Sequence, residues 1–196
     1  MSKARRIWRR DETGRPREFD DPFRIASNTK TCIGLTILQR VDEGKLTTDD
    51  TWFPDFPNAD KITVGDLLHM RSGIPDPFDQ AGLADYYEHP LMIQTAEDRI
   101  AKAAKDPSKF QEPDQETHYI NVNFILLAVI AEKITGQPID VAVHEQVLAP
   151  LDLTHPLYPT NTLLPGELRG YSWEKDTETF KDMTVLNPEV AGGEPF

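Results

Sequence analysis

The chain has 196 residues, which is typical of one domain, and its content of apolar side chains, 38%, is low for that length. Its formal net charge of −12 argues against a nucleic-acid partner, because phosphate groups repel a uniformly acidic chain. No run approaches the roughly 18 apolar residues that a membrane span needs, and the lone Cys32 excludes an internal disulfide.

Residues 1–22 are predicted to form a basic N-terminal segment ahead of a domain at 23–196. Five of the first ten residues are Lys or Arg, and no apolar region of a signal peptide follows them. A solvated tail or an exposed edge strand is favoured over a tether to nucleic acid or membrane. A short hairpin is predicted, with its turn at 11–15. The cellular location stays open.

A helix is predicted from Ser27 to a stop at Gly44. Further helices are predicted at 64–70, capped by Thr63, and at 94–105, 124–134 and 139–148, and strands at 169–173 and 179–185. The first helix is expected to bury Ile33, Ile37, Leu38 and Val41. The helix at 124–134 has the clearest pattern, with Phe124, Leu127, Ala128, Ala131 and Ile134 on one face.

Ser27 and Lys30 carry the first chemical signal. On a helix, residues three apart share a face, so the Lys30 amine reaches the Ser27 hydroxyl. A serine hydroxyl needs an adjacent base to act as a nucleophile, and a lysine amine serves when its surroundings favour the neutral form. Taken alone, Ser-x-x-Lys is a weak signal. A helix cap with a solvated lysine is the commoner meaning of the pattern.

Several motifs together resemble the family of class C β-lactamases, DD-carboxypeptidases, related esterases and D-amino-acid amidases. The first is FRIASNTK at 23–30, followed by ITVGDLLHMRSGIP at 62–75. Tyr119-Ile120-Asn121 is similar to the family's Tyr-x-Asn motif. The run VLAPLDLT at 147–154 resembles a family turn, with Asp152 where a glycine is usual. Several motifs in family order make the resemblance specific.

The resemblance implies an α+β protein with the β-lactamase/transpeptidase-like fold, mostly its helical lobe with an incomplete antiparallel sheet. It also implies that Ser27 becomes acylated and that Lys30 takes or relays the serine proton. Tyr119 would act as partner base and then as acid to the leaving group. Asn121 would bind the substrate amide or orient Lys30. For Tyr119, a buried tyrosine with a satisfied hydroxyl is the alternative.

The sequence also departs from the family pattern. The third motif, Lys-Thr-Gly or His-x-Gly, does not occur in these residues, and the chain looks truncated relative to the family. We therefore weigh two functions. The first is a serine hydrolase acting on an ester, an amide such as a D-amino-acid peptide, or a β-lactam. The second is a catalytically incomplete fragment or pseudoenzyme that serves as a binding module.

No cofactor and no metal is expected. The five histidines lack metal-ligand spacing and the single cysteine offers no thiolate cluster. The expected partner is a small-molecule or peptide acyl substrate. A third alternative, an unrelated helical interaction protein, would place Ser27 and Tyr119 on opposite sides of the fold. The sequence predicts no oligomeric state.

Overall fold

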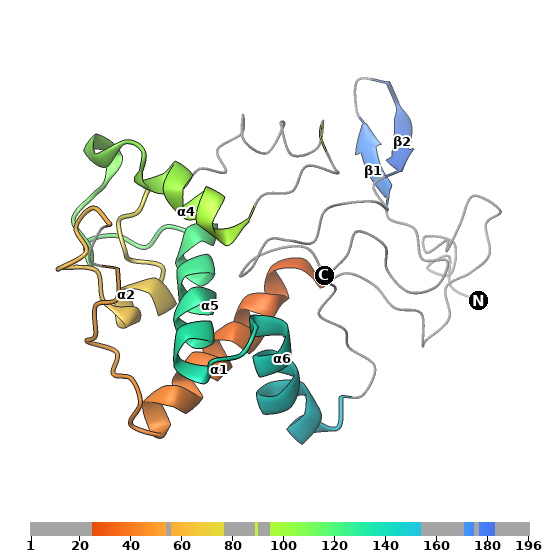
Figure 1. Ribbon diagram of the computed structural model, residues 1–196. Helices are drawn as coiled ribbons and strands as arrows, with labels where there is room; N and C mark the ends of the chain where they lie inside the picture. The colour runs from red at the N-terminus through yellow and green to blue at the C-terminus, as the bar shows by residue number, and fades with distance from the viewer. Residues whose placement is uncertain are drawn as a thin grey trace.

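A computed structural model describes residues 25–53, 56–76, 89, 95–153, 171–174 and 177–182. The basic segment at 1–22 and its predicted hairpin lie outside these residues. The described helices pack around one central helix, and a two-stranded hairpin lies apart from them (Figure 1). The longer helices are α1 (Thr29–Asp42), α4 (Ala96–Ala104) and α5 (Asn121–Thr135), and the shorter ones are α2 (Val64–Leu68) and α6 (Ile139–Val143).

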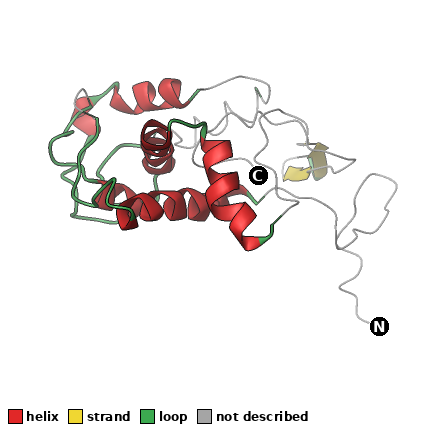
Figure 2. Ribbon diagram, turned by 60° about the horizontal axis from the view of Figure 1, so that its bottom comes forward, coloured by secondary structure: helices red, strands yellow, loops and turns green. Residues whose placement is uncertain are grey.

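Helix α5 is the centre of the packing, with α1, α2, α4 and α6 all against it (Figures 1 and 2). The predicted helix at 124–134 is confirmed, but it starts three residues earlier, at Asn121. Its burial is not confined to the predicted face, since Val122, Ile125 and Ile130 are also fully buried. A helix surrounded by other helices is apolar on nearly every side, which one-face periodicity underestimates.

Among the described residues, no single helix is long and apolar enough to cross a membrane. The stretches Asn121–Thr135 and Ile139–Leu151 pass that test only as a pair, and they bend by 82° at their junction. Burial of α5 inside the helical core accounts for its apolar composition.

Helix α1 turns one face to α5, where Ile33 and Ile37 have no exposed surface. The prediction that Leu38 shares this face is wrong, because Leu38 is 48% exposed on the opposite side. Leu35 is exposed on that side as well. Apolar residues on both faces weaken the periodic signal, and only the packing partners decide which face is buried. The helix ends at Asp42, two residues before the predicted stop at Gly44.

The predicted helix at 139–148 is less regular than expected. Helix α6 continues into the π-helical turn η4 (His144–Leu148) and the 3₁₀ turn η5 (Ala149–Leu151). Pro150 lacks the N–H that a longer α-helix would need. The backbone then reverses at Asp152, whose φ is 55°. This left-handed conformation favours glycine and tolerates Asp, which explains why a glycine is usual at this position in the resembling family.

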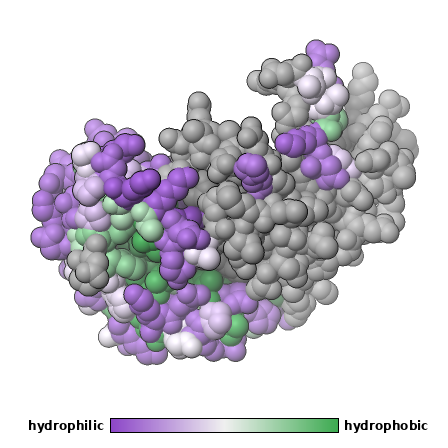
Figure 3. Space-filling model, turned by 45° about the horizontal axis from the view of Figure 1, so that its top comes forward, coloured by the Kyte–Doolittle hydropathy of each residue, from purple (hydrophilic) through white to green (hydrophobic). Residues whose placement is uncertain are grey.

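The described strands are β1 (Tyr171–Glu174) and β2 (Thr179–Asp182), antiparallel, with Tyr171 opposite Asp182 and Trp173 opposite Phe180. They lie where two strands are predicted. Residues 169, 170 and 183–185 of those predicted strands lie outside the described part of the chain. On the face drawn in Figure 3, hydrophilic side chains cover most of the described surface, and an apolar patch lies among them.

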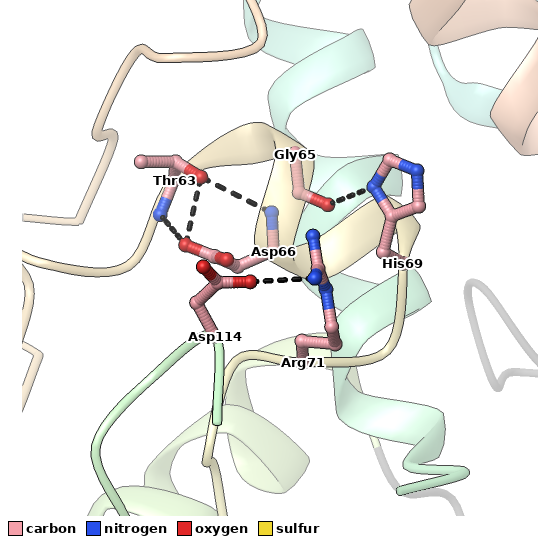
Figure 4. Close-up of polar contacts among 6 residues, drawn as sticks. All are labelled: Thr63, Gly65, Asp66, His69, Arg71 and Asp114. Atoms are coloured by element: carbon pink, nitrogen blue, oxygen red, sulfur yellow. Dashed lines mark hydrogen bonds and ion pairs between the residues drawn. The ribbon is translucent and has the colours of Figure 1, made fainter. Parts of the chain in front are cut away.

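Helix α2 is capped by Thr63, as predicted, and the cap is reciprocal (Figure 4). The Asp66 N–H donates to Thr63 Oγ1 over 3.1 Å, and the Thr63 N–H donates to Asp66 Oδ2 over 3.0 Å. Each bond satisfies an amide that the first helical turn leaves without a partner. The carboxylate of Asp66 also lies near the positive end of the helix.

Because the Thr63 hydroxyl accepts the Asp66 N–H and donates to Asp66 Oδ2, Thr63→Ala is expected to lower the free energy of unfolding by about 1 kcal/mol. The melting temperature should fall by about 2–4 °C. Calorimetry checks this against Thr51→Ala, at an exposed threonine that starts no helix. Equal melting temperatures for the two variants would contradict a capping role.

Candidate active site

Ser27 lies in a tight turn that immediately precedes α1. The turn is the 3₁₀ segment η2 (Ala26–Asn28), preceded by Ile25. Two side chains bond back to it: Asn28 Nδ2 donates to the Ile25 carbonyl over 2.7 Å, and Thr29 Oγ1 donates to the Ala26 carbonyl over 2.9 Å. Ala26 has a φ of 46°, an uncommon conformation for a residue with a Cβ. The backbone is thus tightly constrained immediately before the predicted nucleophile.

Lys30 reaches back to Ser27 across the first turn of α1. Its Nζ lies 3.0 Å from Ser27 Oγ, the hydrogen bond expected from their spacing of three. Lys30 is only 6% exposed. Such burial is unusual, because lysine side chains in folded proteins are nearly always exposed to solvent. The alternative of a solvated lysine beside a helix cap is wrong. Neither N-cap residue, Ile25 of η2 or Asn28 of α1, accepts a backbone N–H with its side chain.

Tyr119 comes from the other side of the site, two residues before α5. The centre of its ring lies 5.0 Å from Lys30 Nζ, a distance at which an ammonium group is attracted to an aromatic face. Tyr119 is 59% exposed, so the alternative of a buried tyrosine is wrong. Because Lys30 contacts both Ser27 and Tyr119, these two residues do not lie on opposite sides of the fold. The arrangement expected of an unrelated helical interaction protein is therefore not found.

Asn121 is the first residue of α5 and belongs to the same region of the fold. Its Oδ1 is buried, and within the described part of the chain it accepts no hydrogen bond. Buried polar atoms in folded proteins nearly always have a partner. This oxygen is therefore a candidate acceptor for a donor from outside the described residues. The predicted orientation of Lys30 by Asn121 does not use this oxygen.

The remaining candidate groups have structural surroundings. His69 Nδ1 lies 2.8 Å from the Gly65 carbonyl (Figure 4), and His118 pairs with Glu116 over 2.9 Å. Burial raises the pKa of the Cys32 thiol, which favours its unreactive protonated form. Among the described residues, no three His, Cys, Asp or Glu side chains gather into a group that could hold a metal ion.

The Beta-lactamase family model matches residues 4–193, nearly the whole chain. The chain belongs to the beta-lactamase family. A curated relative, the putative D-alanyl-D-alanine carboxypeptidase of Escherichia coli K12, is 34% identical over 158 residues, which are 74% of this chain and 35% of the relative. The chain therefore spans about a third of the length of such curated relatives.

Two solved structures place the fold within the beta-lactamase family. The D-stereospecific amidohydrolase from Streptomyces sp. has 32% sequence identity and a TM-score of 0.78, over 90% of this chain and 56% of that one. The D-amino acid amidase from Ochrobactrum anthropi SV3 has 26% identity and a TM-score of 0.79, over 94% and 56%. The fold predicted from the sequence, β-lactamase/transpeptidase-like and mostly helical, is confirmed.

In this beta-lactamase-family chain, sequence analysis missed a buried polar cluster beneath Tyr119. Ser72 and Asn123 have no exposed surface, and Ser72 Oγ donates to Asn123 Oδ1 over 2.5 Å. Met70 contacts the same amide through its sulfur. The signal was present in the sequence, since Asn123 is a polar residue inside an otherwise apolar helix and buried amides need partners.

Proposed function

We propose that this chain carries the acylation site of a serine hydrolase, with Ser27 as nucleophile and Lys30, Tyr119 and Asn121 as its partners. The observation that carries the proposal is the 3.0 Å contact between Lys30 Nζ and Ser27 Oγ, made by a lysine that is almost fully buried. Burying an amine is costly, and its placement on a serine hydroxyl is the arrangement that nucleophilic catalysis requires.

The proposed reaction has two stages. Ser27 Oγ attacks the substrate carbonyl carbon while the Lys30 amine takes the hydroxyl proton, so an O–C bond forms and the carbonyl becomes an oxyanion. The oxyanion then collapses and breaks the bond to the leaving group. The leaving group takes a proton from the Tyr119 hydroxyl, which regains one from the Lys30 ammonium, and water later hydrolyses the acyl-Ser27 ester.

The substrate class we propose is an amide in which the acyl group belongs to a D-amino acid residue. The relatives named D-alanyl-D-alanine carboxypeptidase and D-amino acid amidase support it, since both names describe cleavage of an amide next to a D residue. The buried Asn121 Oδ1 also supports it. An acceptor without a partner among the described residues suits an amide N–H of the substrate, which a simple ester lacks.

Intact-mass spectrometry tests the proposal directly. The protein is incubated with a fluorophosphonate and, separately, with benzylpenicillin. Each reagent is expected to leave one adduct on the wild-type chain and none on Ser27→Ala. Ser108→Ala is the matched control, because Ser108 lies on an exposed turn, bonded to Asp106, and should leave labelling intact. Release of ammonia from D-alaninamide, with L-alaninamide as comparison, then tests the substrate class.

The outcomes separate the two functions weighed from the sequence. A folded wild-type protein that takes up no adduct would overturn the hydrolase proposal and favour a binding module. An adduct that persists in Ser27→Ala would place the nucleophile elsewhere. Labelling by the fluorophosphonate with equal turnover of D- and L-alaninamide would keep the nucleophile and overturn the D-residue substrate.

A further inference from the structure

The turn after α2, at 70–74, lies against the segment at 111–118, which leads to Tyr119 and α5. Three backbone hydrogen bonds join them in antiparallel order: Gln111 N–H to the Gly73 carbonyl over 2.9 Å, Asp114 to Arg71 over 2.8 Å, and His118 to Met70 over 2.9 Å. An ion pair between Arg71 and Asp114 lies over the same junction (Figure 4). The last of these bonds is one residue before Tyr119.

Met70 accepts the last of these three backbone hydrogen bonds. Its backbone is left-handed, with a φ of 58°, which is rare for a residue of its size. Its sulfur receives two donors, the Ile120 N–H over 3.5 Å and Asn123 Nδ2 over 3.3 Å. A thioether sulfur is a weak hydrogen-bond acceptor. In this structure it is nevertheless the acceptor for the Ile120 N–H, the backbone amide that follows Tyr119. Strained backbone conformations persist where the surroundings over-determine them.

Asn123 fixes the other side of the contact. It is fully buried in the first turn of α5, where its Oδ1 accepts from Ser72 and its Nδ2 donates to the Met70 sulfur. Ser72 Oγ also accepts the Ile74 N–H over 3.3 Å. The sulfur is thus held between the start of α5 and the residue that follows Tyr119.

We propose that Met70 is a positioning residue, whose sulfur holds the Ile120 amide and thereby sets the place of Tyr119 against Lys30. Tyr119 is largely exposed, and its ring contacts Lys30 at 5.0 Å. The backbone on both sides of Tyr119 therefore supplies its constraint, through the His118 N–H to the Met70 carbonyl and the Ile120 N–H to the Met70 sulfur. The inference rests on the proposed function, because the position of Tyr119 matters for rate only if Tyr119 takes part in acylation.

A double-mutant cycle tests this inference, with the rate of fluorophosphonate labelling of Ser27 as readout. Met70→Leu keeps the volume and removes the acceptor, and it is expected to slow labelling about tenfold. Tyr119→Phe should slow it about a hundredfold. If Met70 acts through the Tyr119 hydroxyl, the double variant labels as slowly as Tyr119→Phe alone, because groups that act as a unit are not additive.

Two further variants separate positioning from general destabilisation. Met70→Gln returns an oxygen acceptor on a chain of similar length and should label faster than Met70→Leu. Ile130→Val trims a fully buried residue of α5, outside the contacts of Met70, and should lower the melting temperature while leaving the labelling rate unchanged. If Met70→Leu does not fold, Met70→Gln carries the test. It is expected to label within threefold of wild type, and a tenfold loss would overturn the inference.

The failures are distinguishable. A wild-type protein that is not labelled overturns the proposed function and the inference with it. A labelled wild type whose Met70→Leu variant reacts at the same rate overturns the inference alone. So does a full tenfold loss from Met70→Leu in the Tyr119→Phe background, because that loss would not pass through the tyrosine hydroxyl.

Discussion

Lys30→Met is expected to slow the fluorophosphonate labelling of Ser27 by about 1000-fold. The Lys30 amine lies 3.0 Å from the Ser27 hydroxyl, within reach of its proton, and is the candidate base for it. Loss of a positioned base costs about 100- to 10,000-fold in rate. Methionine fills much of the space of the lysine chain without supplying a base. Labelling reactions are quenched at a series of times, and the labelled fraction at each time, measured by intact-mass spectrometry, gives the rate constant.

Lys61→Met is the matched control for this prediction. Lys61 is exposed and pairs with Glu112, which raises the pKa of the lysine. Its loss should leave the labelling rate unchanged, because a surface ion pair contributes little to the fold. A Lys30→Met variant that folds and is labelled within tenfold of the wild-type rate would contradict the role of Lys30 as base. Tyr119 would then be the remaining candidate.

Gly73→Ala is expected to destabilise the fold by about 2–4 kcal/mol and to lower the melting temperature by about 5–15 °C. A Cβ at Gly73 would come within 2.3 Å of the Gln111 carbonyl oxygen, which is backbone and cannot rotate away. The φ of Gly73 is also +71°, a conformation that side chains disfavour. The two effects add because both belong to the folded state.

Gly136→Ala separates those two effects. Gly136 has nearly the same φ, +70°, but an added Cβ there would meet nothing within 4 Å. This variant should cost about 1 kcal/mol, from the backbone conformation alone. Urea unfolding of both variants gives the difference, which we assign to the clash with Gln111. Equal losses would mean that the junction between 70–74 and 111–118 adapts, and that it does not hold Tyr119 rigidly.

Much of the candidate site was predictable, because its chemistry is local. A spacing of three along a helix brings the Lys30 amine to the Ser27 hydroxyl, whatever else the chain does. The approach of Tyr119 was predicted from family resemblance and not from spacing, since it lies 89 positions after Lys30 in the chain. The contacts of Met70 were not predicted at all. A single methionine in a sequence indicates packing in the core, and nothing in the sequence indicates that its sulfur accepts hydrogen bonds.

The sequence by itself determined the helix positions, the capped start of α2, the Ser27–Lys30 pair and the family. These depend on short-range periodicity, on side chains that bond to nearby backbone, and on residue order. Tertiary packing alone decided that Leu38 is exposed, that α5 is buried on nearly all sides, and that Tyr119 faces Lys30. Burial and distant contacts depend on which helix surfaces pack together. An amphipathic pattern shows only that one face of a helix must be buried, and not which partner covers it.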